Sequence, residues 1–430
     1  MLGSNIASYA VVWYITLKTG SSTQFALLVI ASQLTMGITA VFGGIWSDRY
    51  WRKALIIGAD IGTAVATFGL AAFFLLGYDS LWLIVVVLAI RGVMMGVRNP
   101  SVTASIPQLV PTRHLMRVNS LNGAMQAVIS LGSPAIAAVL LIKVPLGLIF
   151  MIDAVATMVA VGLILLVRLP RLIKETPKPS GLAPWYEEVP AAGMAMKLRR
   201  LFFKLIYAIA AYFEEMIDAI KVMRLRPGLL RVTGVLAFLV FTVVPVAQLT
   251  PIFIARYFGD EPWMLAAGET AWSAGMVAGG LILMAWGGMR NRMSLIMITA
   301  VTWVVFSVLM GVSPNLVVFC VVMVVWGISL AALNATLVTT AQEQVEAKLL
   351  GRVMGLLSFI LNVAGPIGIA IIGFLADFVS LRLLCIAAGG AAAVFLGLLR
   401  LIGGPGQPLM APDAKVETPT EDPNAPDATA

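Results

Sequence analysis

Twelve apolar runs constrain this chain more than any other feature of its sequence. Each is roughly 20 residues long, the length at which a helix crosses a bilayer core about 30 Å thick while pairing its own backbone polar groups. Hydrophobic residues make up 60% of the chain, whereas soluble domains are about 45–50% apolar. The sequence therefore predicts an all-α integral membrane protein, with transmembrane helices near 1–17, 24–46, 54–76, 80–106, 119–142, 147–167, 228–254, 263–286, 294–312, 315–340, 353–376 and 380–402.

The basic residues orient these helices in the membrane, because Lys and Arg accumulate in cytoplasmic loops. If the loop at 43–53 is cytoplasmic, most of the 29 Lys and Arg residues fall on the inner side. The outer side then keeps Lys18, Lys143, Arg256 and Arg382. We therefore expect both termini in the cytoplasm. The net charge of +8 follows from this bias, and no basic face on a soluble domain is present to bind nucleic acid.

The first six spans and the last six resemble each other. RVNSL at 117–121 is echoed by RVMGL at 352–356, and GGIWSDR at 43–49 by GGMRNR at 287–292. Proline and small residues recur in the fifth and eleventh spans as expected helix-packing positions, namely Pro134, Gly365 and Pro366. Weak symmetry of this kind, with a substrate site between the two halves, is typical of secondary transporters.

This symmetry divides the chain into four parts. An N-terminal six-helix bundle covers 1–167, and its first span is short and begins at Met1, which leaves open whether part of that span is missing. A cytoplasmic linker with an amphipathic helix covers 168–227, and a C-terminal six-helix bundle covers 228–402. The Pro-, Asp- and Thr-rich segment 403–430 is typical of a disordered cytoplasmic tail.

The loop GGIWSDRYWRK at 43–53 carries an unusual concentration of charge between the second and third spans. It fits the pattern Gly, any, Leu, small, Asp, Arg, any, Gly, Arg, Arg or Lys, with Trp46 and Trp51 replacing the Leu and the second Gly. The matching positions are Gly44, Ser47, Asp48, Arg49, Arg52 and Lys53. With this loop and two related sets of six spans, the chain resembles the major facilitator superfamily.

The resemblance implies that this loop is a conformational latch. Asp48 would face the N-terminus of helix eleven in the outward-open state, and Arg49 and Arg52 would tie the inner ends of the N-terminal bundle. A carboxylate at a helix N-terminus is stabilised by roughly 0.3–1 kcal/mol, which a conformational change can break and restore. The alternative, a loop that is merely basic because it is cytoplasmic, leaves Asp48 unexplained.

Three later stretches narrow the resemblance to the bacterial branch of macrolide-efflux and enterobactin-export proteins. They are PSVTASIPQLVP at 100–111, AYFEEMIDAIKVMRLRPGLL at 211–230 and AGETAWSAGMVAGG at 267–280. The resemblance implies a multi-pass protein of the bacterial plasma membrane, and we expect a monomer. The fifth span departs from the branch in holding Ser133, Ala137 and Ala138 where glycines are usual.

Six ionisable residues are expected at membrane depth, within the spans or, for Asp377, directly beside one: Asp60, Arg91, Arg98, Asp153, Glu269 and Asp377. Insertion into lipid costs such a residue ~2.5–3.5 kcal/mol, so those that remain usually face the protein interior or a wet cavity. Because Glu269 matches an acidic position of the branch, we predict that it couples transport to protons, with a water-facing rim residue as the alternative. Arg91 matches the coupling arginine of the family, although the glycine that follows it is displaced by one position.

The other four residues have simpler interpretations. Asp60 lies where it can pair with Arg98, as a structural ion pair or as a proton site. Asp153 and Asp377 lie near the outer surface and are interpreted as solvated rim residues.

Polar and aromatic residues on otherwise apolar helices predict the lining of a central cavity, whose walls suit a small amphiphilic substrate. Some of these residues will instead form hydrogen bonds between helices. The candidates are Asn5, Tyr9, Trp13, Gln33, Asn122, Gln126, Gln248, Trp272, Asn334 and Asn362.

The sequence thus favours a secondary exporter that exchanges protons for a drug-like or siderophore-like amphiphile. An importer or lipid flippase of the same fold is the alternative, and a non-transporting receptor is a third. The sequence contains no GxSxG, HExxH or GxxxxGK motif, which argues against an enzyme or a nucleotide-driven pump. Cys320 and Cys385 lie far apart in apolar runs, so we expect no disulfide, metal or cofactor.

Overall fold

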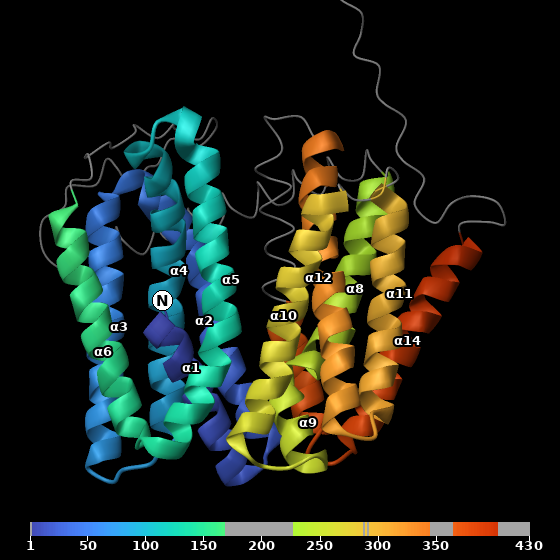
Figure 1. Ribbon diagram of the computed structural model, residues 1–430, viewed down its shortest axis with the longest axis horizontal. Helices are drawn as coiled ribbons and strands as arrows, with labels where there is room; N and C mark the ends of the chain where they lie inside the picture. The colour runs from blue at the N-terminus through green and yellow to red at the C-terminus, as the bar shows by residue number, and fades with distance from the viewer. Residues whose placement is uncertain (1, 168–226, 287–288, 290–291, 345–363, 403–430) are drawn as a thin grey trace, which may run out of the picture.

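The computed structural model of this protein describes residues 2–167, 227–286, 289, 292–344 and 364–402, and this part of the chain is helical throughout its regular structure (Figure 1). The N-terminal half contains α1 (Leu2–Thr19), α2 (Ser22–Arg49), α3 (Arg52–Leu75), α4 (Leu81–Leu109), α5 (Thr112–Lys143) and α6 (Leu146–Leu166). The C-terminal half contains α8 (Pro227–Gln248), α9 (Thr250–Tyr257), α10 (Pro262–Trp286), α11 (Arg292–Val312), α12 (Leu316–Gln344), Ala364–Leu375 and α14 (Leu381–Ile402).

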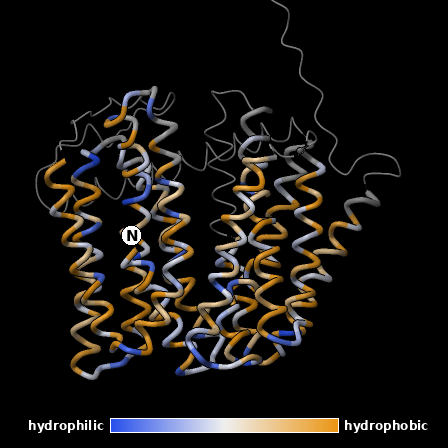
Figure 2. Tube along the Cα trace, viewed as in Figure 1, coloured by the Kyte–Doolittle hydropathy of each residue, from blue (hydrophilic) through white to orange (hydrophobic). Residues whose placement is uncertain are grey.

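Each of the twelve predicted spans contains a helix, which confirms the predicted fold class. Among the described residues, eight helices are long and apolar enough to cross a membrane, or nine if a bent pair counts as one span. Large apolar side chains such as Val65, Val86 and Val317 are exposed, as expected of lipid-facing positions. Figure 2 shows apolar residues along the helices and hydrophilic residues gathered at many of their ends.

The span expected at 228–254 is not one continuous helix. It is broken between α8 and α9, whose axes differ by 43°. Pro245 lies inside α8 and Pro251 at the start of α9, and proline lacks the N–H that a continuous helix requires. The break places Gln248 and Pro251 at the wall of a cavity described below.

The two halves repeat the same helix pairs. In the N-terminal half α2 packs most extensively against α4, and α3 against α6. The corresponding pairs in the C-terminal half are α10 with α12 and α11 with α14. Glycine permits the close approach in both halves: a Cβ at Gly92 would collide with Ser32 of α2, and one at Gly275 with Val324 of α12. The repeat seen in the sequence is therefore also a repeat in packing.

The halves meet along α5 and α10, which converge toward one end of the molecule in Figure 1. Ser273 of α10 donates a hydrogen bond of 3.1 Å to the Ser130 carbonyl of α5. The end toward which these helices converge carries α9 and the starts of α2 and α14. We call it the joined end, and we call the opposite end, which carries the ends of α2 and α10, the separated end.

The predicted linker and tail lie outside the described residues, as do residues 353–363 of the eleventh span. The RVMGL echo belongs to that segment. The domain boundaries therefore remain predictions.

Candidate functional site

A cavity of about 340 Å³ lies between the two halves. The N-terminal half lines it chiefly from α1 and α2, and the C-terminal half from α8, α10 and α12. Aromatic side chains form much of the wall, namely Tyr9, Trp13, Phe25, Trp272 and Trp326. A cavity bounded by both halves changes shape when the halves move relative to one another, which is the geometry a transporter requires.

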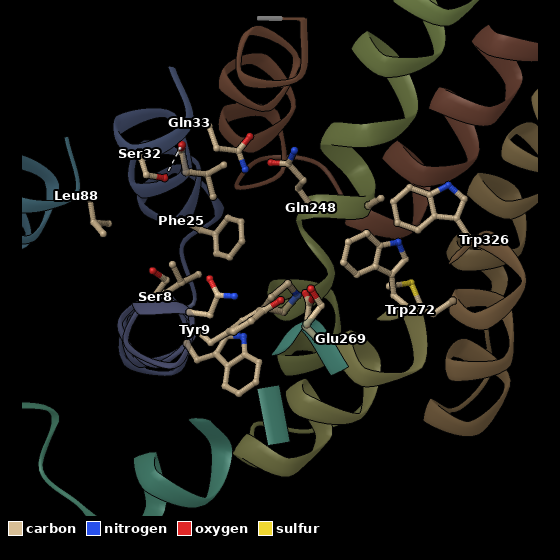
Figure 3. Close-up of a pocket in the computed structure, with 18 residues that line it drawn as sticks. Ser8, Tyr9, Phe25, Ser32, Gln33, Leu88, Gln248, Glu269, Trp272 and Trp326 are labelled. Atoms are coloured by element: carbon tan, nitrogen blue, oxygen red, sulfur yellow. Dashed lines mark hydrogen bonds between the residues drawn. The ribbon is translucent and has the colours of Figure 1, made fainter. Parts of the chain in front are cut away.

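Six of the ten residues predicted for the cavity line it: Asn5, Tyr9, Trp13, Gln33, Gln248 and Trp272. Gln33 and Gln248 come from opposite halves, and Figure 3 shows their amide groups next to each other.

The remaining candidates are not among the residues that line this cavity. Gln126 lines a second cavity within the N-terminal half. Asn122 of α5 and Asn334 of α12 are exposed and are absent from the described wall of either cavity. Asn362 is outside the described residues.

The aromatic wall is supported by ring contacts on both sides of the cavity. The rings of Tyr9 and Trp13 have centroids 5.4 Å apart. On the other side Trp272 lies 6.1 Å from Trp326, which stacks on Phe306 at 4.6 Å. The first two pairs are tilted and the last is stacked. Such contacts restrict the motion of the rings, so these rings offer defined surfaces on which a ligand can pack.

Glu269 brings a carboxylate into this wall. It lies in the second turn of α10, and Figure 3 shows it close to Tyr9 of α1. Within the described part of the chain, no group forms a hydrogen bond or an ion pair with its carboxylate. Glu269 therefore supplies the cavity wall with an acidic group that has no partner among the described residues, and its coupling role stays a prediction.

A second cavity of about 240 Å³ lies inside the N-terminal half. Arg98 of α4 donates from Nε to Asp60 Oδ1 of α3 at 2.7 Å, which confirms the predicted pair. Both residues line this cavity. Asp60 itself is only 5% exposed.

The interpretation of Asp153 as a solvated rim residue is wrong. Asp153 is buried, and its Oδ2 accepts a hydrogen bond of 2.7 Å from Arg91. Its Oδ1 accepts from the Ser4 hydroxyl at 2.9 Å, and Arg91 also donates to Thr67 Oγ1 at 2.7 Å. These partners lie on α1, α3 and α4. The position of Asp153 near one end of its span did not predict them.

Asp377 joins the two halves at the joined end. Its carboxylate accepts hydrogen bonds from the backbone N–H groups of Ser22 and Thr23 at 2.7 and 3.0 Å, and from the Ser21 hydroxyl at 2.9 Å. Arg256 of α9 donates to Asp377 Oδ1 at 2.9 Å and to the Gly20 carbonyl at 2.7 Å. Although Asp377 is an exposed residue, it is thus more than a solvated rim position.

These contacts perturb the titration of Asp377. Burial raises the pKa of its carboxyl, but hydrogen bonds from Thr23, Ser22 and Ser21 outweigh burial and hold the pKa well below its usual range. The carboxylate lies at the N-terminus of α2, whose unpaired N–H groups attract negative charge. The contact is therefore a charged cap supplied to one half by the other.

The predicted latch residues lie at the separated end. Arg52 donates from Nε to the Ser47 carbonyl at 2.8 Å and from a terminal nitrogen to the Ala104 carbonyl of α4 at 2.5 Å. Lys53 donates to the carbonyls of Leu165 and Val167, at 2.9 and 2.7 Å. These bonds join α2, α3, α4 and the end of α6 within the N-terminal half.

The rest of the latch is only partly described. Gly44 accepts a hydrogen bond of 2.7 Å from the Ser47 hydroxyl. The side chains of Asp48 and Arg49 and the N-terminus of the eleventh helix lie outside the described residues. The contact expected between Asp48 and that helix remains a prediction.

The predicted packing positions are buried. Pro134 lies inside α5, where it is buried. Gly365 is buried with Val244 and Gln248 of α8 nearby, and Pro366 follows it in the same helix. No group of three or more His, Cys, Asp or Glu side chains within the described ranges is placed to hold a metal ion.

Sequence reasoning missed several residues of these sites. Phe25 and Trp326 line the central cavity but look in the sequence like any aromatic residue of an apolar helix. The Ser21–Gln24 stretch does carry a signal, because Ser followed three residues later by Gln marks a helix N-terminus, and Ser21 accepts from the Gln24 N–H. Its partner Asp377 is too distant in sequence to be inferred.

Comparison with known proteins agrees with this architecture. Residues 1–369 match the model of the Major Facilitator Superfamily. The chain is 27% identical over 384 residues to Macrolide efflux protein A of Streptococcus pyogenes, an alignment that covers 88% of this chain and 86% of that protein. It is 24% identical over 439 residues to the Multidrug efflux pump Tap of Mycobacterium tuberculosis, covering 97% and 94% of the two chains.

Solved structures show the same arrangement of helices. A POT family transporter in complex with a thioalcohol conjugated peptide superposes with a TM-score of 0.69 over 94% of this chain and 93% of that chain, at 11% identity. Similarity at that identity concerns the fold alone. With the family model matched over most of the chain, helices that repeat in two halves and a cavity between them, we conclude that this protein is a multi-pass membrane transporter that belongs to the Major Facilitator Superfamily.

Proposed function

We propose that the protein is an exporter that exchanges protons for a bulky, cationic, drug-like amphiphile, working as a monomer in the bacterial plasma membrane. The observation that carries this proposal is the carboxylate of Glu269 in an aromatic cavity, without a partner among the described residues. Such a group attracts a cation, and its aromatic surroundings accept the apolar body that carries the charge.

The chemistry of the wall favours a cation over an acidic, siderophore-like compound. A cation that lies over the ring face of Tyr9 or Trp272 is stabilised by about 0.5–2 kcal/mol. The amides of Gln33 and Gln248 donate or accept hydrogen bonds with polar groups of the substrate. An anionic substrate would bring like charge to Glu269 and lose affinity.

One carboxylate that binds either a proton or a cationic substrate produces antiport. When Glu269 holds a proton it is neutral and does not retain the cation. When it loses the proton the cation can bind, so the two ligands are exchanged across the membrane as the cavity alternates between its two sides. This competition requires no contact between the proton and the substrate.

The joined end suits the outer side of the membrane, as the positive-inside rule predicts. Asp377 then closes the outer end by capping α2, while the separated end faces the cytoplasm. The latch predicted from the family is the reciprocal contact, in which Asp48 at the end of α2 caps the eleventh helix. Each state would be held by a carboxylate on a helix N-terminus, worth about 0.3–1 kcal/mol and more if partly buried.

The relatives support the outward direction. The two named above are a macrolide efflux protein and a multidrug efflux pump. Extending that activity to this chain is part of the proposal.

The test is uptake of radiolabelled tetraphenylphosphonium, a bulky apolar cation, into liposomes that contain the purified protein. Valinomycin with equal potassium on both sides holds the membrane potential at zero, so the pH gradient is the only driving force. We expect an acidic interior to accelerate uptake and nigericin to abolish the acceleration. An acidic exterior that accelerates uptake would indicate an importer instead.

Two variants identify the coupling group. Glu269→Gln keeps the size of the side chain and should abolish the response to the pH gradient, whereas Glu269→Asp should retain part of it. An unchanged response in Glu269→Gln would remove Glu269 from the mechanism.

A further inference from the structure

The second cavity is lined by the buried carboxylate of Asp60, one of whose oxygens lacks a hydrogen-bond partner among the described residues. Asp60 Oδ1 accepts the hydrogen bond from Arg98, but Asp60 Oδ2 is buried and has no hydrogen-bond partner among the residues that the structure describes. A buried acceptor without a partner is unfavourable by about 1–3 kcal/mol. Such an atom in a native protein requires an explanation, for example a role in binding.

The neighbouring ion pair, Asp153 with Arg91, provides a comparison within the same half. Asp153 lines the same cavity, yet both of its oxygens are satisfied, by Arg91 and by Ser4. Both aspartates are buried and paired with an arginine, but only Asp60 keeps a carboxylate oxygen without a partner among the described residues. A purely structural ion pair does not require a carboxylate oxygen without a partner.

The surroundings of Asp60 can hold water. The cavity has a volume of about 240 Å³ and is lined by polar side chains from several helices, among them Asn5 of α1 and Asn99 of α4. Roughly 30 Å³ is the share of one water molecule in the liquid. The charged groups lining the cavity with Asp60 are Arg98 from α4 and Asp153 from α6, while α1 and α5 contribute uncharged groups.

The two cavities adjoin at Asn5, which lines both. Asp60 of the N-terminal half and Glu269 of the C-terminal half therefore lie in neighbouring cavities that share one residue of their walls. Asp60 is eight residues into α3, about 12 Å along the helix from its start. It thus lies within the membrane-spanning part, where an ionisable residue is a candidate functional site.

We propose that Asp60 is a second proton-exchange site, occupied from water in the cavity of the N-terminal half. A hydronium ion transfers its proton to Oδ2 and leaves as water, and the carboxylate becomes a neutral carboxylic acid. The Coulombic attraction to Arg98 is then lost, and the cavity gains one positive charge. This assignment rests on the proposed function. Each half then has one proton site, and two protons are exchanged for each exported cation.

Carbodiimide labelling tests the site without any transport assay. Dicyclohexylcarbodiimide is apolar and reacts with carboxylic acids in their protonated form, leaving a stable acylurea that peptide mass spectrometry locates. On the intact wild-type protein in detergent, we expect labelling at Asp60 that accelerates as the pH falls, with Asp153 unlabelled as the matched control. Labelling of neither aspartate, or equal labelling of both, would overturn the proposal.

The reaction is repeated with sodium chloride in place of choline chloride. Equal labelling supports the proton as the ligand. Protection of Asp60 by sodium would make the site a metal-cation site and overturn the assignment to protons.

Electrogenic transport tests the link to export. Exchange of two protons for one monovalent cation moves net charge, so a valinomycin-imposed potential should alter tetraphenylphosphonium exchange by the wild type beyond its effect on protein-free liposomes. Asp60→Asn should remove that effect while keeping the response to the pH gradient, whereas Glu269→Gln should lose the pH response. If labelling occurs but neither gradient drives transport, the proposed function fails and the proton site stands. If labelling occurs but transport remains electroneutral in the wild type, the assignment of two protons is wrong.

Discussion

The N-terminal and C-terminal halves pair their helices in the same way but differ in their buried charges. Both place a glycine-lined contact between their second and fourth helices. The N-terminal half holds two buried carboxylates, each paired with an arginine. The C-terminal half brings Glu269 to the central cavity beside a cluster of aromatic rings. The repeat therefore preserves packing, while the polar residues have diverged to separate tasks.

The largest effect should come from breaking a buried ion pair of the N-terminal half. Arg91→Ala leaves Asp153 as an unpaired buried charge, which typically destabilises by about 3–5 kcal/mol. Glu269→Gln removes a carboxylate that has no described partner, so its stability should stay near that of the wild type. Apparent melting temperatures in detergent measure both variants. Equal losses would contradict the division between a paired and an unpaired carboxylate.

The next largest loss of stability should be equal in the two halves. Gly92→Ala and Gly275→Ala each place a Cβ against the backbone of the neighbouring helix, and overpacking of this kind costs about 1–3 kcal/mol. Gly69→Ala and Gly280→Ala are matched controls, because a Cβ at either position meets open space. A large loss in one half and none in the other, measured by thermal unfolding, would show that the packing repeat is not shared.

The contact that joins the halves should influence conformation more than folding. Asp377→Ala removes the cap of α2, and loss of a cap costs about 0.5–2 kcal/mol. The joined end, which we propose faces the outside, should then open more often, so Ser8→Cys in the cavity should react faster with an impermeant thiol reagent added outside cells. An unchanged rate would show that this contact does not hold the joined end closed.

The same contact should not respond to pH near neutrality. The folded pKa of Asp377 lies below its unfolded value, so its contribution is present above the ordinary aspartate range and is lost only as the pH falls through the lower folded value. In a protein that also carries Glu269→Gln and Asp60→Asn, and so lacks the proposed proton sites, the Ser8→Cys reaction rate, normalised to a fully exposed control cysteine, should therefore stay constant between neutral and mildly acidic pH. A rise in mild acid would point to another titrating group at the joined end.

The smallest effect should fall on the aromatic wall. Trp272→Phe weakens the attraction to a cation by about 0.5–1 kcal/mol, or roughly two- to fivefold in affinity. Trp303→Phe is a control, since Trp303 is buried within the same cluster and does not line the cavity. Binding of tetraphenylphosphonium measured by calorimetry should weaken for the first variant alone.

The fold was predictable from the sequence because membrane helices depend on length and hydropathy, which are local properties. The pair of Asp60 and Arg98 was predictable for a related reason, since both lie at similar depth on consecutive antiparallel helices. The break between α8 and α9 was not anticipated, because Pro245 and Pro251 lie within an otherwise continuous apolar run.

The site was less predictable because it depends on which helices meet. The pairing of Asp153 with Arg91 and Ser4, and that of Asp377 with α2, joins positions distant in sequence. Asn122 of α5 and Asn334 of α12 are exposed and line neither described cavity, so their place in a substrate cavity stays a prediction. Residue type identifies the candidates, but only the arrangement of the helices shows which of these side chains point into the cavity.

The central claim is that the two halves move against each other about the central cavity. Pulsed electron paramagnetic resonance measures the distance between two spin labels on exposed residues, and so reports this motion directly. Tyr50→Cys with Met284→Cys reports on the separated end, and Leu76→Cys with Phe378→Cys on the joined end. Cys320 and Cys385 are replaced by serine in both labelled proteins, which are compared with and without tetraphenylphosphonium at acidic and neutral pH.

We predict reciprocal changes, in which the first pair of labels moves closer under the conditions that move the second pair apart. Distances that remain fixed at both ends under every condition, or that change in the same direction at both ends, would contradict the account.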